Sequence, residues 1–175
     1  MAQARHDLGP AISVKAEARG QPGQRSFRIL VEAQGGSAVI WLEKEQLVGL
    51  ALAIERVIAL AESSKTAKAS SRLHSTSTFH AEFKARSLTL TYDERAYRFG
   101  ILAQDVEDAE SGPPAISMTV SREQAGAFAE AALAVCAAGR PRCPLCSQPM
   151  NPGEAHACAR SNGHGLGKLS GNAPS

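Results

Sequence analysis

Apolar and polar positions alternate over the first forty residues and then change to a helical spacing. Residues 12–18 and 27–33 carry apolar side chains at every second position, the period of a half-buried strand. Residues 38–42 are apolar throughout and follow a turn at Gly35-Gly36. From 47 to 61 apolar residues recur every three or four positions, with charged residues between them, so this segment predicts an amphipathic helix on a sheet.

The same succession of patterns returns after residues 63–78, whose Ser, Thr, Lys and Ala content is typical of a connection between elements. Alternation resumes over 83–92, and a change of phase at Arg86-Ser87 predicts a β-bulge. Two further strands are expected over 97–104 and 116–120, and a second helix follows them.

The two expected helices begin in similar ways. Ser121-Arg122-Glu123-Gln124 is a capping box, and Glu43-Lys44-Glu45-Gln46 precedes the first helix 78 positions earlier. Residues 27–30 resemble 97–102, and residues 18–20 resemble 85–87. We therefore predict an α+β fold, in which a tandem β-β-β-α duplication forms an antiparallel sheet with two packed helices. The alternative is a chance similarity between two amphipathic helices.

The patterns divide the chain into three parts. Residues 9–139 form the duplicated domain, with halves of about 9–62 and 79–139, and Gly139 is the expected C-terminal cap of the second helix. Residues 140–165 form a small zinc-ribbon-like tail. The last part, 166–175, is rich in Gly, Ser, Asn and Pro and is expected to be disordered.

Composition narrows the class of protein only a little. Aromatic residues are 5% of the chain, so we expect a core built mainly from Ala, Val, Ile and Leu. The net charge of +2 commits the protein to no polyanionic partner. Charged residues 5 and 7 interrupt any signal-peptide pattern, and the longest apolar segment is short and charged. We therefore expect a cytoplasmic protein with no membrane association.

The strongest chemical signal is a set of cysteines and one histidine in the tail. Cys143 and Cys146 form a CxxC pair, and nine residues separate it from His156 and Cys158. A CxxC turn directs two sulfurs to one point, and a second pair two residues apart can complete a tetrahedron. Four such ligands leave no open position, which favours a structural Zn²⁺ over a catalytic one.

Other interpretations of these residues stay open. A redox-active CxxC is the first alternative, although prolines and glycine follow the pair where a thioredoxin-type motif would open a helix. Unligated thiols are the second. His164 is a substitute ligand for His156, and Cys136 lies on the apolar stripe of the second helix, where a core position is expected.

Several stretches resemble the bacterial family called Domain of Unknown Function 3090, in which a duplicated α+β body is joined to a cysteine-rich tail. The resemblance covers roughly residues 9–165 and implies no activity. Ser147 and Ala159 depart from the family's usual Gly and Pro, and residues 153–155 are one longer than usual, but no ligand is lost. The resembling stretches are Gly20-Gln21-Pro22-Gly23-Gln24-Arg25-Ser26-Phe27, Leu42-Glu43-Lys44-Glu45-Gln46, Ala138-Gly139-Arg140-Pro141-Arg142-Cys143-Pro144-Leu145-Cys146, His156, Cys158, Arg160 and Asn162-Gly163-His164.

Three functions remain under consideration. The first is a non-catalytic protein-interaction module, because no nucleophile, Walker or dinucleotide motif is present in the sequence. The second is nucleic-acid binding by the basic tail. The tail has one acidic residue, Glu154, and four basic residues, Arg140, Arg142, Arg160 and Lys168, but it has no aromatic residue that could stack on bases. The third is an enzyme of unknown class. Its candidate residues are Arg25, in a hairpin turn, and the acidic residues Asp105, Glu107, Asp108 and Glu110, which are more typical of a solvated loop.

Overall fold

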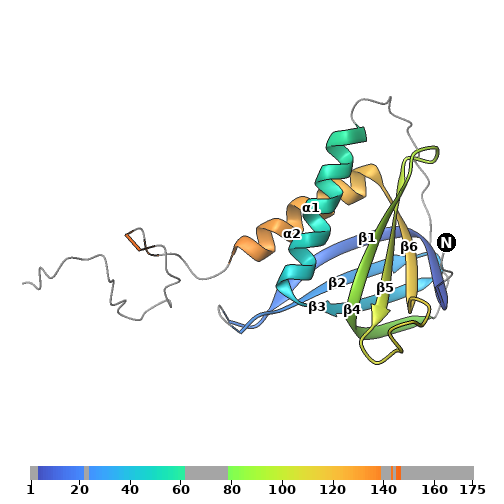
Figure 1. Ribbon diagram of the computed structural model, residues 1–175, viewed down its shortest axis with the longest axis horizontal. Coiled ribbons are helices and arrows are strands. Elements are labelled where there is room, and N and C mark those ends of the chain that lie inside the picture. The colour runs from blue at the N-terminus through green and yellow to red at the C-terminus, as the bar shows by residue number, and fades with distance from the viewer. Residues whose placement is uncertain (1–3, 22–23, 62–78, 139–142, 144, 147–175) are drawn as a thin grey trace, which may run out of the picture. The chain divides into compact units, whose positions relative to one another are not determined.

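The computed structural model describes residues 4–21, 24–61, 79–138, 143, 145 and 146 (Figure 1). The chain divides into two units, residues 1–138 and 139–175, and the helices and strands of the described residues lie in the first. The α+β class is confirmed, and the order β-β-β-α occurs twice. In chain order the elements are β1 (His6–Arg19), β2 (Ser26–Ala33), β3 (Gly36–Leu42), α1 (Lys44–Ala61), β4 (His80–Asp93), β5 (Arg98–Asp105), β6 (Ile116–Ser121) and α2 (Arg122–Ala137).

The six strands close into a barrel in the order β1-β2-β3-β4-β5-β6. The prediction of an antiparallel sheet is wrong at two positions, because β3 pairs with β4 in parallel and β1 pairs with β6 in parallel. A parallel neighbour requires a crossover connection, and the segment that contains α1 supplies it between β3 and β4. The sequence period specifies which side chains face inward but not the direction of the neighbouring strand.

Each of the long strands β1 and β4 pairs with one neighbouring strand along its first part and with its other neighbour along its second part. The first part of β4 pairs with β3 as far as Lys84, and from Ala85 onward β4 pairs with β5. The register shifts between Ala85 and Ser87, so the predicted bulge is confirmed. In β1 the corresponding shift lies between Ala11 and Ser13, and the resemblance of residues 18–20 to 85–87 therefore does not match the structure.

A glutamine in the first turn of each helix binds the bulge beside it. The predicted capping box of α2 is present: the backbone N–H of Gln124 donates to Ser121 Oγ at 3.1 Å, and the side-chain oxygen Gln124 Oε1 accepts the backbone N–H of Ser121 at 2.9 Å. Gln124 Nε2 also donates to the carbonyl oxygen of Ala11 at 3.0 Å. Gln46 of α1 does the same, accepting the Glu43 N–H at 2.8 Å and donating to the Arg86 carbonyl oxygen at 2.9 Å.

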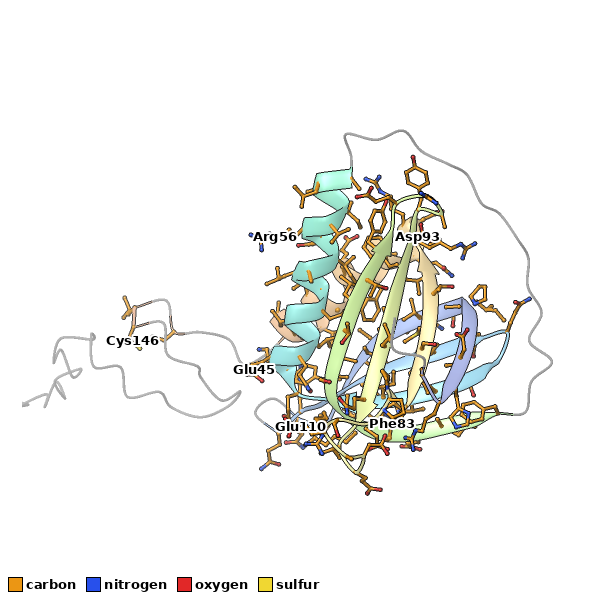
Figure 2. All side chains as sticks on the ribbon, turned by 45° about the vertical axis from the view of Figure 1, so that its right-hand side comes forward. Glu45, Arg56, Phe83, Asp93, Glu110 and Cys146 are labelled. Atoms are coloured by element: carbon orange, nitrogen blue, oxygen red, sulfur yellow. The ribbon has the colours of Figure 1, made fainter. Side chains whose placement is uncertain are left out.

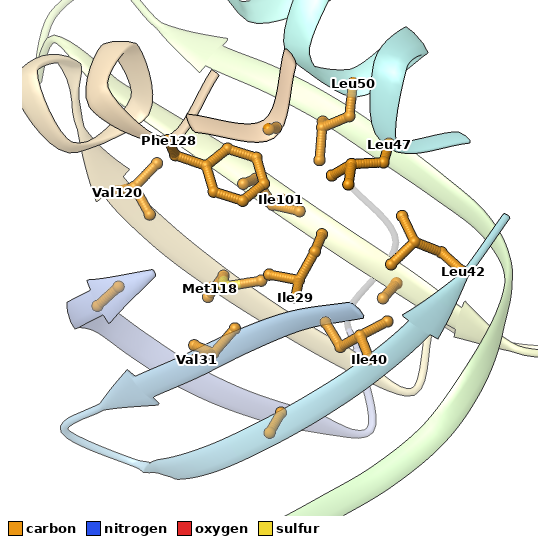
Figure 3. Close-up of a cluster of buried hydrophobic side chains, with 14 of the residues drawn as sticks. Ile29, Val31, Ile40, Leu42, Leu47, Leu50, Ile101, Met118, Val120 and Phe128 are labelled. Atoms are coloured by element: carbon orange, nitrogen blue, oxygen red, sulfur yellow. The ribbon is translucent and has the colours of Figure 1, made fainter. Parts of the chain in front are cut away.

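The core fills the barrel and the space under the two helices (Figure 3). Alternate residues of β2 and β3 point into it, and α1 adds Leu47 and Leu50 from above. Cys136 of α2 is buried there too, as its place on the apolar stripe predicts. Within the described residues no polar or charged residue is buried, and no helix is long and apolar enough to cross a membrane.

The end of α2 is described only as far as Ala138, whose N–H donates to the Ala134 carbonyl oxygen at 3.0 Å. The predicted cap at Gly139 lies outside the described residues. So do residues 140–165, except Cys143, Leu145 and Cys146, and all of 166–175.

Substitution of Gln124 by Ala should lower the free energy of unfolding by about 1–3 kcal/mol, because it removes the side-chain half of the capping box and the Gln124 donor to the bulge carbonyls of β1. Urea denaturation measures this change. Glu130→Ala, at an exposed position in the middle of α2, is the control and should change stability by less than about 0.5 kcal/mol. Equal stability of the two variants would show that the glutamine does not hold the bulge.

Candidate functional site

Two of the four predicted zinc ligands lie in the described residues. Cys143 is only 5% exposed, Cys146 is half-buried, and Leu145 and Cys146 form part of a turn. Paired thiols around a turn are suitable donors for Zn²⁺. His156, Cys158 and the substitute ligand His164 lie outside the described residues, so the convergence of the four ligands stays a prediction. Among the residues that are described, no three His, Cys, Asp or Glu side chains come together around a possible metal position.

Cys136, the third cysteine in the described residues, differs from Cys143 and Cys146 in its chemical environment. Cys136 is packed in the core under α2, and burial raises the pKa of its thiol. A thiol that stays protonated is a poor nucleophile and a poor metal ligand. This cysteine therefore serves as an internal reference for chemistry at Cys143 and Cys146.

Two of the residues considered for catalysis, Arg25 and Asp108, make structural contacts. Arg25 donates a hydrogen bond from Nη1 to the carbonyl oxygen of Ala138, at the end of α2. In the acidic loop, Asp108 forms an ion pair with Arg5. Arg86 Nη2 donates to the Val106 carbonyl oxygen at 2.6 Å and to the Asp108 carbonyl oxygen at 3.1 Å. These contacts attach the loop and the helix end to the barrel.

A polar and aromatic network crosses the outer face of strands β1 to β4. Arg28 donates from Nη2 to Glu17 Oε2 at 2.7 Å and from Nε to the same oxygen at 3.1 Å. The Arg28 guanidinium carbon lies 5.3 Å from the centroid of the Trp41 ring, within the range of a cation–π contact. Trp41 Nε1 donates to Glu82 Oε1 at 2.8 Å. We call Glu17, Arg28, Trp41 and Glu82 the outer-face cluster.

Half-buried apolar side chains lie beside the outer-face cluster. Leu30 of β2 is directly opposite Val39 of β3, and both side chains alternate with residues that point into the core. Lys15 of β1 is opposite Leu30 in the same row. Lys84, opposite Trp41, forms a 2.7 Å ion pair with Glu43. The outer face therefore has an apolar centre bordered by charges of both signs.

The Arg28 contact perturbs the titration of Glu17. The hydrogen bond from the Arg28 guanidinium is the main cause that lowers the pKa of this carboxyl below its ordinary value, and the positive charges nearby add to it. The ionised form of Glu17 is thus the form that the folded protein favours.

A second surface feature lies between α1 and β4, which stand side by side in Figure 2. It consists of two adjacent hollows of about 420 and about 470 Å³, within the size range of ligand clefts. The Tyr92 hydroxyl in the second hollow is buried and has no hydrogen-bond partner among the described residues. The first is lined by Gln46, Gly49, Leu50, Ala53, Arg86, Ser87, Leu88 and Leu90, and the second by Val57, Leu60, Ala61, Tyr92, Glu94 and Tyr97.

Neither surface was predicted from the sequence. The run 38–42 reads as uniformly apolar, although the strand period separates Ala38, Ile40 and Leu42 from Val39 and Trp41. The sequence signal that could have indicated the outer-face cluster was Trp41, the one tryptophan of the chain, at a position where the strand period directs the side chain outward.

Trp41 can report the state of the outer-face cluster, because no other tryptophan contributes to the fluorescence. A lowered folded pKa means that the Glu17 contribution to stability is present above the unfolded pKa and is lost as the pH falls through the folded pKa. We expect a fluorescence change on acidification below the ordinary pKa of a glutamate, as Arg28 loses its partner.

The same experiment has two matched variants. Glu17→Gln should show the altered fluorescence already at neutral pH and a smaller acid transition, because only the Glu82 contact of Trp41 remains. Glu32→Gln, on the same face of β2, should keep the transition. An unchanged acid transition in Glu17→Gln would mean that this carboxylate does not control the position of Arg28.

Comparison with known proteins gives one match. The model of the family described as "Protein of unknown function (DUF3090)" matches residues 6–158, a range that contains the barrel, both helices and all four predicted zinc ligands. No curated protein and no solved structure matches the chain. The chain belongs to the DUF3090 family, as its resemblance in the body and the cysteine-rich tail indicates.

Proposed function

We propose that this protein is a zinc-binding, non-catalytic protein-interaction module, whose body binds a partner protein through the outer-face cluster and the adjoining Leu30 and Val39. The observation that carries the proposal is the position of Trp41. Its ring lies on the outer side of β3, held between the Arg28 guanidinium and the Glu82 carboxylate. Tryptophan and arginine are the residues that most often dominate the energy of protein interfaces.

The arrangement of Trp41 favours binding energetically. Its N–H is bonded and its ring is covered on one side by a side chain that is itself fixed by Glu17. A side chain that is already ordered loses little conformational entropy when a partner covers it. Lys15 borders the apolar row and forms no ion pair within the described residues. The partner surface that fits is an apolar side chain flanked by a carboxylate.

For the tail, the proposal is a structural Zn²⁺ held by Cys143, Cys146, His156 and Cys158. Support comes from the chemistry of the donors, from the burial of Cys143, and from the family match, which extends through Cys158. The binding free energy of a structural Zn²⁺ contributes directly to folding. A reducing cytoplasmic setting suits thiolate ligands better than disulfides.

For the body, the proposal is that it arose by a β-β-β-α duplication. The recurrence of the element order supports this origin. So does the recurrence of one interaction, in which Gln46 and Gln124 bind the bulge carbonyls of β4 and β1.

The zinc site predicts about one Zn²⁺ per chain in protein purified without added metal, measured by elemental analysis. Cys143→Ser and Cys146→Ser should reduce the zinc content to below about half, since each removes one of four ligands. Cys136→Ala is the matched control and should keep the metal. His156→Ala and His164→Ala compared in the same way identify the fourth ligand. Full zinc retention in both cysteine variants would refute the site.

If the docking surface is correct, Trp41→Ala should raise the dissociation constant for the partner about thirtyfold or more. This factor corresponds to the loss of about 2 kcal/mol of binding free energy, the value typical of a hot-spot residue. The partner is recovered from lysate on the immobilised full-length chain, purified, and titrated against both proteins. Leu102→Ala, a half-buried outward position on β5, is the matched control and should bind normally. Capture that resists Trp41→Ala would exclude this surface, and capture abolished by nuclease would favour nucleic-acid binding instead.

A further inference from the structure

The two hollows between α1 and β4 form one elongated groove. Residues 46–53 of α1 and 86–90 of β4 line the first hollow, and residues 57–61 of α1 and 92–97 of the β4–β5 turn line the second, so the hollows follow one another along both elements (Figure 2). From Leu50 to Leu60 the helix rises about 15 Å, and from Leu88 to Tyr92 the strand rises about 14 Å. We call the two hollows together the α1–β4 groove.

The other half of the barrel has smaller side chains in the equivalent place. Counted from the first residue after each bulge, three half-buried side chains of β4 correspond to three of β1 that also pack against the core. These are Leu88, Leu90 and Tyr92 in β4, and Val14, Ala16 and Ala18 in β1. α2 contacts β1 more extensively than α1 contacts β4. The larger β4 side chains therefore hold α1 farther from its strand, and the groove is the space that remains.

A glycine in α1 leaves the first hollow open. Among ordinary residues only proline is less favourable than glycine inside a helix, so a glycine there usually serves close packing. Gly49 serves none, because a Cβ atom at this position would meet no atom within 4 Å. Gly49 lines the first hollow, and a longer side chain would occupy it. The glycine thus costs helix stability and preserves the groove.

The end of the groove at the β4–β5 turn holds groups that accept hydrogen bonds. The Tyr92 hydroxyl is buried without a partner among the described residues, a state that destabilises a fold until some group bonds the oxygen. Glu94 makes no ion pair in the part of the chain that the structure describes. Tyr97 lines the same end. At the opposite end Gln46 and Arg86 are already bonded to backbone carbonyl oxygens, so a polar group is best recognised at the turn.

We propose that the α1–β4 groove binds a linear amphiphile, a medium-length aliphatic chain that carries a protonated amine. The chain lies between the apolar walls, and the ammonium lies at the turn. An ammonium has three donors and no acceptor, which suits the Glu94 carboxylate and the Tyr92 oxygen together. The two tyrosine rings also favour a cation. Leu60, with 74% of its surface exposed, lines this end and can change rotamer to admit the head group without disturbing the core.

Calorimetric titration of the full-length chain with decylamine, below the concentration at which the amine aggregates, should show one site per chain. Butylamine should bind at least about thirtyfold more weakly, because each buried methylene adds about fourfold to the affinity. Decanol should bind more weakly than decylamine, since it lacks the charge, and decanoate more weakly still, since its charge repels that of Glu94.

Filling the groove is the test of its place. Gly49→Leu should weaken decylamine binding at least about tenfold, while its melting temperature stays equal to that of the wild type or rises, because leucine is the better helix former. Ala59→Leu, at an exposed position of α1 that lines neither hollow, is the matched control and should bind decylamine normally. Normal binding by a folded Gly49→Leu variant would overturn the proposal.

Two variants test the head group. Glu94→Gln should weaken decylamine binding at least about fivefold and leave decanol binding unchanged, whereas Glu110→Gln, in the exposed acidic loop, should change neither. Tyr92→Phe should keep or raise the stability of the unliganded chain, because the lost hydroxyl has no partner there, yet it should weaken decylamine binding. A merely structural tyrosine would show the opposite, a loss of stability with unchanged binding.

The groove and the outer-face cluster can be tested separately, because Trp41 does not line the groove. Trp41→Ala should therefore bind decylamine as the wild type does. No binding at ~1 mM decylamine, or equal affinity for decylamine and decanoate, would overturn the proposal and leave the outer-face cluster untouched.

Discussion

The fold depends on the way two glutamine side chains satisfy the carbonyl oxygens of two β-bulges. A strand that leaves one neighbour and joins another must interrupt its ladder, and the carbonyl groups released there need donors. Gln46 and Gln124 supply these donors and, with the same side chains, accept the backbone N–H at the start of their helices. One side chain thus fixes the bulge, the helix start and the position of the helix on the barrel.

The exposed surfaces follow from the same arrangement. Because β1 and β4 each serve two neighbours in succession, each retains one edge without a strand partner in the described structure. Lys15, Glu17 and Arg19 protect the β1 edge, and the same Glu17 also fixes Arg28 against Trp41. The charged residues on the β1 edge are therefore part of the surface proposed to bind a partner, whereas α1 runs alongside the β4 edge.

The sequence was sufficient to predict the elements but not their neighbours. Alternation over 27–33, the phase change at Arg86-Ser87 and the capping box at Ser121 predicted strands, a bulge and a helix start that the structure confirms. Periodicity reports inside and outside only, so the parallel pairs β3–β4 and β1–β6 and the lack of a strand partner along one edge of β4 were not predictable from it. The ligand set Cys143, Cys146, His156 and Cys158 rests on spacing and donor chemistry and stays a prediction.

The outer-face cluster ends at the β4 bulge. Trp41 is opposite Lys84 in the last pair between β3 and β4, and Gln46 binds the β4 backbone two residues later at Arg86. A change at that bulge would move the β4 border of the cluster, which carries Glu82, relative to Arg28 and Trp41. The glutamine that positions α1 on the barrel therefore also positions one border of the proposed docking surface.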